Sequence, residues 1–74
     1  MATVTKTRNQ TGNTGALAAD TLFYVSEGTV EFSTDAGTTY IPFGVGEKII
    51  FSAALTVHWR GGGTGQFTFS HMAV

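Results

Sequence analysis

The side chains with the greatest capacity for chemistry in this sequence are two histidines, His58 and His71. Imidazole titrates near neutral pH, and two of them with a carboxylate could hold a zinc ion. Each lies in a predicted strand, and we expect the two strands to be neighbours. Successive side chains of a strand point to opposite faces. By this alternation His58 should lie on the polar face of its strand, whereas His71 should lie on the same face as Phe67 and Phe69. Because the imidazoles should therefore point to opposite faces, we predict no metal site and no cofactor.

Nucleophilic and acid–base catalysis also lack a supporting pattern. No serine lies in a Gly-x-Ser-x-Gly sequence or at a strand-to-helix turn. Glu27 and Glu31 flank a predicted bend at Gly28, and nothing places them in one cleft. The glycine-rich segment 61–65 has no lysine beside it and no helix after it that could bind a phosphate, so we interpret it as a hairpin loop. The sequence predicts a protein that is not an enzyme.

Aromatic side chains could stack on bases or sugars. Trp59, Phe67 and Phe69 resemble a base-stacking platform, but all three share the parity of the predicted core. Four Lys and Arg residues stand against five acids, which leaves no basic patch, so we predict no nucleic-acid partner. Sugar binding through Tyr24, Tyr40 or Trp59 stays open as an alternative.

The elements that position these side chains are short β-rich segments separated by glycine. Alternation of apolar and polar residues is clearest around Trp59 and Phe69. We predict an all-β domain at residues 20–74, a small antiparallel β-sandwich or barrel of about six short strands. The predicted strands are Thr21–Val25, Thr29–Thr34, Thr38–Ile41, Lys48–Phe51, Leu55–Arg60 and Gln66–Met72. The continuous apolar runs 22–25 and 49–51 indicate strands buried on both faces or covered by a second subunit.

The first nineteen residues differ in texture from the rest of the chain. They are rich in Asn, Gln, Gly and Thr and have no sustained periodicity, so we predict that residues 1–19 form a flexible N-terminal arm. An extended arm can add a strand to the edge of a partner's sheet. The candidate partner-contact residues in the arm are Thr3, Thr5, Lys6 and Arg8.

One local motif is specific. Residues 33–40, Ser-Thr-Asp-Ala-Gly-Thr-Thr-Tyr, resemble the Asp-box, a Ser-x-Asp-x-Gly-x-Thr sequence followed by an aromatic residue in sialidase-type propeller blades. Asp35 can accept hydrogen bonds from turn amides, Gly37 can adopt a positive φ, and Tyr40 can fold over the hairpin. The motif occurs once, in a chain too short for two propeller blades. We therefore interpret these three residues as a structural turn with no catalytic role.

Length and composition favour a protein that associates with itself or with a larger assembly. A domain of 74 residues is marginally stable, and the absence of cysteine excludes disulfide bonds, which leaves self-association or attachment to a larger assembly. Charged residues make up 12% of the chain and the net charge is −1, so much of the surface must be Thr, Ser, Gly and apolar atoms. No apolar run approaches the roughly 20 residues of a membrane helix, and no signal-peptide core is present. We expect a soluble, non-secreted protein with no membrane partner.

The segment from Val30 to Val74 resembles small virion proteins of tailed bacteriophages. The likeness lies in VEFSTDAGTTY at 30–40, GEKIIF at 46–51, and LTVHWR at 55–60 followed by a glycine-rich loop. It implies a non-catalytic capsid decoration (cement) protein, made in the host cytoplasm and located on the virion. Such a protein would bind the major capsid protein and stabilise the head through its arm and β body.

The same resemblance favours a homo-oligomer, with a trimer as the expected form. A tail, neck or fibre-associated structural protein is the alternative within the same setting. A small carbohydrate- or ligand-binding β module is the alternative from another class.

Overall fold

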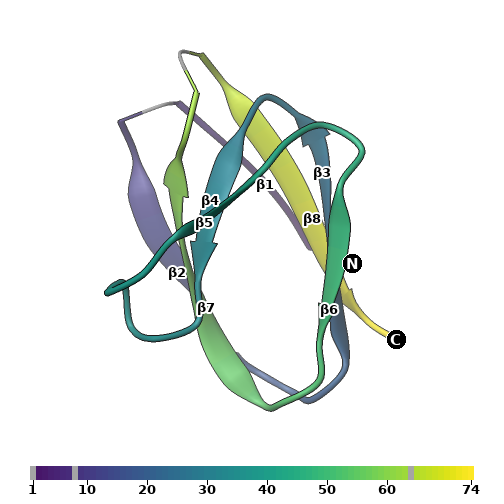
Figure 1. The fold of residues 1–74 in the computed structure, drawn as a ribbon. Coiled ribbons are helices and arrows are strands. Elements are labelled where there is room, and N and C mark those ends of the chain that lie inside the picture. Colours follow the sequence, from purple (N-terminus) through teal and green to yellow (C-terminus); the bar gives the residue numbers. More distant parts are fainter. Residues whose placement is uncertain (1, 8, 64) are drawn as a thin grey trace.

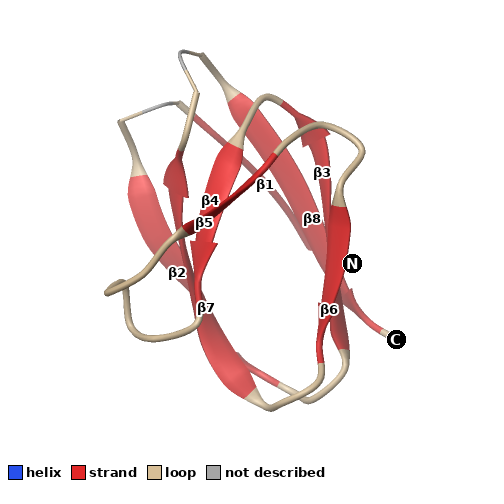
Figure 2. Ribbon diagram, viewed as in Figure 1, coloured by secondary structure: helices blue, strands red, loops and turns tan. Residues whose placement is uncertain are grey.

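The computed structural model describes residues 2–7, 9–63 and 65–74. In these residues the chain forms eight strands and no helix (Figure 2). The strands are β1 (Ala2–Lys6), β2 (Thr11–Leu17), β3 (Thr21–Glu27), β4 (Val30–Ser33), β5 (Ile41–Phe43), β6 (Lys48–Phe51), β7 (Leu55–Gly61) and β8 (Phe67–Ala73). The prediction of a small antiparallel β-sandwich is confirmed, with eight strands in place of about six.

The strands form two four-stranded antiparallel sheets that face each other (Figure 1). Sheet A has the order β1-β8-β3-β6, and sheet B has the order β2-β7-β4-β5. The chain changes sheet at each connection between these strands except β4–β5, which is a hairpin within sheet B. This order is that of an eight-stranded jelly roll, which consists of two Greek keys.

The core lies between the sheets and is built mostly from aromatic rings. Alternation buries Val30 and Phe32 on β4, Val57 and Trp59 on β7, and Phe67 and Phe69 on β8, as the period-two pattern predicts. On β3, Phe23 and Val25 complete the set of buried apolar residues. The aromatic rings meet mainly edge to face or stacked, the geometries that their quadrupoles favour.

The prediction of a separate N-terminal arm is wrong for the residues that the structure describes. β1 pairs with β8 from Ala2 to Lys6, and β2 pairs with β7 from Thr11 to Leu17, so each forms an edge of one sheet. Val4 and Leu17 pack against the core. Both strands expose nearly all of their other side chains, so the apolar alternation that reveals a strand is reduced to a few positions.

Two predictions about the C-terminal strands are also wrong. β7 and β8 are not neighbours, because β7 pairs with β2 and β4 in sheet B and β8 pairs with β1 and β3 in sheet A. β7 and β8 therefore do not form the hairpin that was predicted around the glycine-rich segment 61–65, of which residue 64 lies outside the described residues. The predicted strand Thr38–Ile41 is displaced as well, because residues 38–40 belong to a turn and β5 begins at Ile41.

Candidate functional site

The Asp-box-like segment forms the turn between β4 and β5. The buried Ser33 hydroxyl donates to Asp35 Oδ1 at 2.6 Å and accepts the amide hydrogens of Asp35 and Gly37. Asp35 Oδ1 also accepts the amide of Thr39 at 2.8 Å. Gly37 has a φ of 88°, and the ring of Tyr40 lies under the Arg60 guanidinium, with 4.0 Å from Cζ to the ring centroid. The three predicted turn residues therefore lie in one hydrogen-bonded loop.

The outer face of sheet B is polar. Arg60 on β7 forms a salt bridge with Glu31 on β4, and His58 lies between Asn13 and Ser33 in the strand register. None of the exposed large apolar side chains of the described residues projects from this face. The outer face of sheet B therefore carries the Glu31–Arg60 salt bridge, hydroxyl groups and the turn that holds Asp35.

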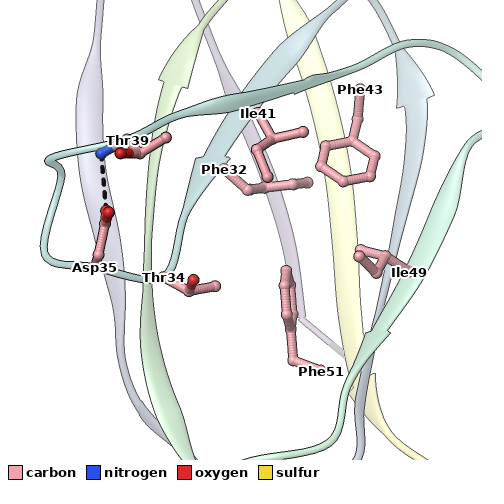
Figure 3. A pocket seen from close by; sticks show the side chains of 8 residues that line it. All are labelled: Phe32, Thr34, Asp35, Thr39, Ile41, Phe43, Ile49 and Phe51. Atoms are coloured by element: carbon pink, nitrogen blue, oxygen red, sulfur yellow. Dashed lines mark hydrogen bonds between the residues drawn. The ribbon is translucent and has the colours of Figure 1, made fainter.

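An apolar groove opens between the edge strands β5 and β6, which belong to different sheets and do not pair (Figure 3). Side chains of both strands lie around Phe32, which is also part of the lining. The cavity has a volume of about 250 Å³, and Asp35 lies at its polar rim. The lining residues are Phe32, Thr34, Asp35, Thr39, Ile41, Phe43, Ile49 and Phe51. We refer to this feature as the β5–β6 groove.

A second apolar surface lies on the outer face of sheet A. The strand register places Met72, Leu22 and Ile50 in one row across β8, β3 and β6, and Tyr24 lies in the next row. Ile50 is 52% exposed, Tyr24 42% and Met72 38%. We refer to Leu22, Tyr24, Ile50 and Met72 as the sheet A patch. Of the two alternatives given for the apolar runs 22–25 and 49–51, burial on both faces within one chain is wrong, since Tyr24 and Ile50 are exposed on the outer face. Cover by a second subunit stays a prediction.

The candidate partner-contact residues of the N-terminal segment lie on sheet A. Thr3 and Thr5 face outward, and their hydroxyl groups bond to those of Ser70 and Thr68 at 3.1 and 3.0 Å. Lys6 ends β1 and is exposed. Arg8 lies outside the described residues. Thr3 and Thr5 therefore make strand contacts inside the chain, whereas the prediction gave them to a partner's sheet.

The side chains considered for chemistry do not converge. His71 stacks on Phe23, with 5.2 Å between ring centroids, and His58 belongs to the outer face of the other sheet. Trp59 is 6% exposed inside the core, while Tyr24 and Tyr40 lie on opposite sheets. These three aromatic residues thus form no common sugar-stacking surface.

Within residues 2–7, 9–63 and 65–74, no three His, Cys, Asp or Glu side chains gather in a group that could hold a metal ion. The same part of the chain has no helix that is long and apolar enough to cross a membrane.

Comparisons with protein-family models, curated proteins and solved structures gave no match to this chain. Sequence reasoning did not find the β5–β6 groove, because its lining comes from the inner faces of strands that alternation alone assigns to the core. Pro42 in the middle of β5 was the available signal, since proline in a strand marks an edge.

Stability should fall in acid, because two folded-state groups resist protonation. Burial lowers the pKa of His71 from its usual 6.5, so the unfolded chain takes up this proton first and stability declines as the pH drops below about 6.5. Hydrogen bonds from Ser33 and the Thr39 amide lower the pKa of Asp35 from 3.8. The contribution of Asp35 to stability is fully present above pH 3.8 and is lost as the pH falls through the folded-state pKa.

Urea midpoints measured from about pH 8 to about pH 3 check this expectation. His71→Phe, which keeps a ring against Phe23, should remove the decline near pH 6.5. Asp35→Asn should remove the loss of stability that occurs at lower pH and should leave the decline near pH 6.5 unchanged. A wild-type midpoint that stays constant from pH 8 to pH 5 would contradict the role given to His71.

Proposed function

We propose that this chain is a non-catalytic virion structural protein, a capsid decoration protein of a tailed bacteriophage, and that it attaches to the head shell through the β5–β6 groove. The resemblance of residues 30–74 to small virion proteins supplies the setting. Jelly rolls are a common architecture of viral coat domains, although a fold alone does not determine a function. Sparse charge and marginal size favour a protein that works while clamped to larger neighbours.

The observation that carries the proposal is the open side of the sandwich. Ile41 belongs to the inner face of β5, in register with the buried Phe32, yet it is 59% exposed because β5 and β6 are edge strands of different sheets and do not pair. Phe43, Ile49 and Phe51 are half-buried around the same opening. Covering these side chains with apolar atoms would be favourable by about 25 cal/mol for each Å² removed from water.

The size of the groove favours a protein partner over a small molecule. Its volume of about 250 Å³ lies below the roughly 300–1,000 Å³ of most small-ligand pockets. One or two apolar side chains of an extended shell segment fit this size better than an oligosaccharide. Attachment through a flexible arm is not part of the proposal, because residues 2–6 and 11–17 are strands of the two sheets.

Co-sedimentation with expanded, undecorated phage heads tests the proposal. The purified chain should bind saturably at micromolar concentration and should raise the temperature at which the heads break open. Ile41→Lys places an ammonium group in the groove and should weaken binding at least about tenfold, which corresponds to ~1.4 kcal/mol. The matched control is Thr11→Lys, at an exposed position of β2 on the outer face of sheet B.

Two outcomes would reject the proposal. Absence of binding by the folded wild-type chain would favour a tail, neck or fibre protein, which should instead bind purified tails. Binding that survives Ile41→Lys but is lost in Thr11→Lys would place the contact on sheet B. Circular dichroism of each variant confirms that the β fold is retained.

A further inference from the structure

We infer that the sheet A patch is an interface between two copies of this chain, which pack sheet A against sheet A about a two-fold axis. The inference goes beyond the proposed function and does not depend on it, since a dimer would form with or without a head shell. Leu22, Tyr24, Ile50 and Met72 form the patch.

The asymmetry between the two outer faces is the first argument. Of the six exposed large apolar side chains in the described part of the chain, Tyr24, Ile50 and Met72 lie on this face and Val74 follows it, while Ile41 lines the groove and Val45 lies in the connection between β5 and β6. The amide of Val74 bonds to the Asp20 carbonyl at 3.0 Å, which holds the chain end beside β3. Exposed apolar side chains gathered on one sheet face mark a contact surface.

The register of sheet A makes the patch self-complementary. Met72 and Ile50 flank Leu22 on either side, in one row across three strands. A two-fold axis along β3 sets Leu22 and Tyr24 of each copy against their own equivalents and sets Ile50 of one copy against Met72 of the other. Such an isologous contact matches apolar side chains throughout the row.

The charges around the patch are compatible with this arrangement. Lys48 lies on β6 in the row of Tyr24, whose other neighbours across the sheet are Ser70 and Thr3. The same two-fold axis places Lys48 of one copy over Ser70 of the other, so two ammonium groups do not meet. Glu27 is held at the far end of β3 by hydrogen bonds from Gln66 and Thr68. Because the face offers little charge with which to select a different protein, a second copy is its best match.

The available area fits a weak dimer. The two longer dimensions of the molecule are 31 and 24 Å, and their product, about 740 Å², bounds the area of one face. Each partner in an interface of standard size buries roughly 800 Å². Because this upper bound lies below 800 Å², a contact over nearly the whole face would fall in the smaller half of the standard range, which predicts a dimer that dissociates on dilution. A trimer, which the sequence favoured, would require two different surfaces to meet.

Sedimentation velocity of the full chain from about 1 to about 100 μM tests the inference. The wild-type chain should approach twice the mass of one chain with rising concentration. Ile50→Lys should weaken the association at least tenfold, because it sets a charge against Met72 of the other copy. Ile41→Lys is a matched control: it makes the same substitution at an equally exposed isoleucine of an edge strand, and it should leave the association unchanged.

A cysteine variant tests the axis even where a charged variant perturbs the fold. Packed sheets lie about 10 Å apart, beyond the reach of a direct disulfide bond, so a short bis-maleimide linker is the probe. The chain contains no other cysteine. In the Tyr24→Cys variant, the cysteines of the two copies should be linked to each other in high yield. In the Thr56→Cys variant, on the outer face of sheet B, the two copies should stay unlinked.

The inference is overturned by a wild-type chain that stays monomeric at 100 μM, by a trimer, or by a dimer that loses affinity in Ile41→Lys and not in Ile50→Lys. Efficient linking of Thr56→Cys but not of Tyr24→Cys would also overturn it. Each of these results is independent of binding to heads, so it is distinguishable from failure of the decoration role.

Discussion

Replacing Phe69 with alanine is expected to lower the free energy of unfolding by about 3–5 kcal/mol. The side chain is fully buried at the centre of the sandwich. Its ring centroid lies 5.0 to 6.5 Å from the ring centroids of Phe32, Phe23, Trp59, Phe67 and His71. Because both sheets contribute these rings, the cavity left by alanine cannot collapse by the movement of one strand. A small domain with a total stability of roughly 5–15 kcal/mol would be largely unfolded by heating to a modest temperature.

Urea denaturation followed by tryptophan fluorescence measures this loss, since Trp59 is the single tryptophan. Phe43→Ala is the matched control, because Phe43 is half-buried at the groove and packs on the rim of the core. Phe43→Ala should lower the free energy of unfolding much less than Phe69→Ala does. A loss below about 1 kcal/mol in Phe69→Ala would mean that the aromatic cluster is not the centre of the core.

Gly28→Ala is expected to destabilise the chain by at least about 2 kcal/mol. Gly28 connects β3 to β4 with a φ of 68°. A Cβ atom there would lie 2.3 Å from the carbonyl oxygen of Gln66 and 3.0 Å from Cα of Phe67. Both are backbone atoms, so the crossing between the sheets must shift away from the start of β8.

The comparison with Gly15→Ala separates the two costs of this substitution. Gly15 has a similar φ of 74°, but no heavy atom lies within 4 Å of the added Cβ. That variant should show the strain of the backbone conformation alone, about 1–2 kcal/mol. Thermal and urea unfolding of both variants measure the difference. Equal losses of unfolding free energy at the two positions would show that the backbone near Gln66 moves away from the added Cβ without destabilising the chain.

The central strands could be predicted from sequence because one face of each is buried. On β7 and β8, alternation around Val57 and Trp59 and around Phe67 and Phe69 states directly which side chains face inward. The Asp-box-like turn was predictable for a different reason. Its hydrogen bonds join residues at most four positions apart, so local sequence determines them.

The edge strands and the order of the strands could not be predicted in the same way. β1 and β2 are held mainly by backbone pairing with β8 and β7, and an edge strand needs few apolar side chains. The sheet to which a strand belongs depends on contacts between distant residues, as in the pairing of Thr3 with Ser70. The segment 61–65 has a composition that suits a hairpin or a crossing between sheets equally well.

The β5–β6 groove and the sheet A patch could not be predicted from the sequence, because both follow from this topology. Ile41 and Ile49 look like core residues in sequence, and they line a groove only because β5 and β6 lie at unpaired edges of opposite sheets. Ile50 and Leu22 lie in apolar runs, and only the observed register places them together on an outer face. β6 contributes to both surfaces: Ile49 and Phe51 line the β5–β6 groove, and Ile50 belongs to the sheet A patch.

The most direct measurement of the decoration role is a cryo-electron microscopy reconstruction of expanded phage heads mixed with the chain. We expect ordered density for the sandwich on the shell, with the β5–β6 groove filled by a segment of the capsid protein and the outer face of sheet B turned toward solvent. Bare shells at saturating protein concentration, or density in which the outer face of sheet B meets the shell, would contradict the account.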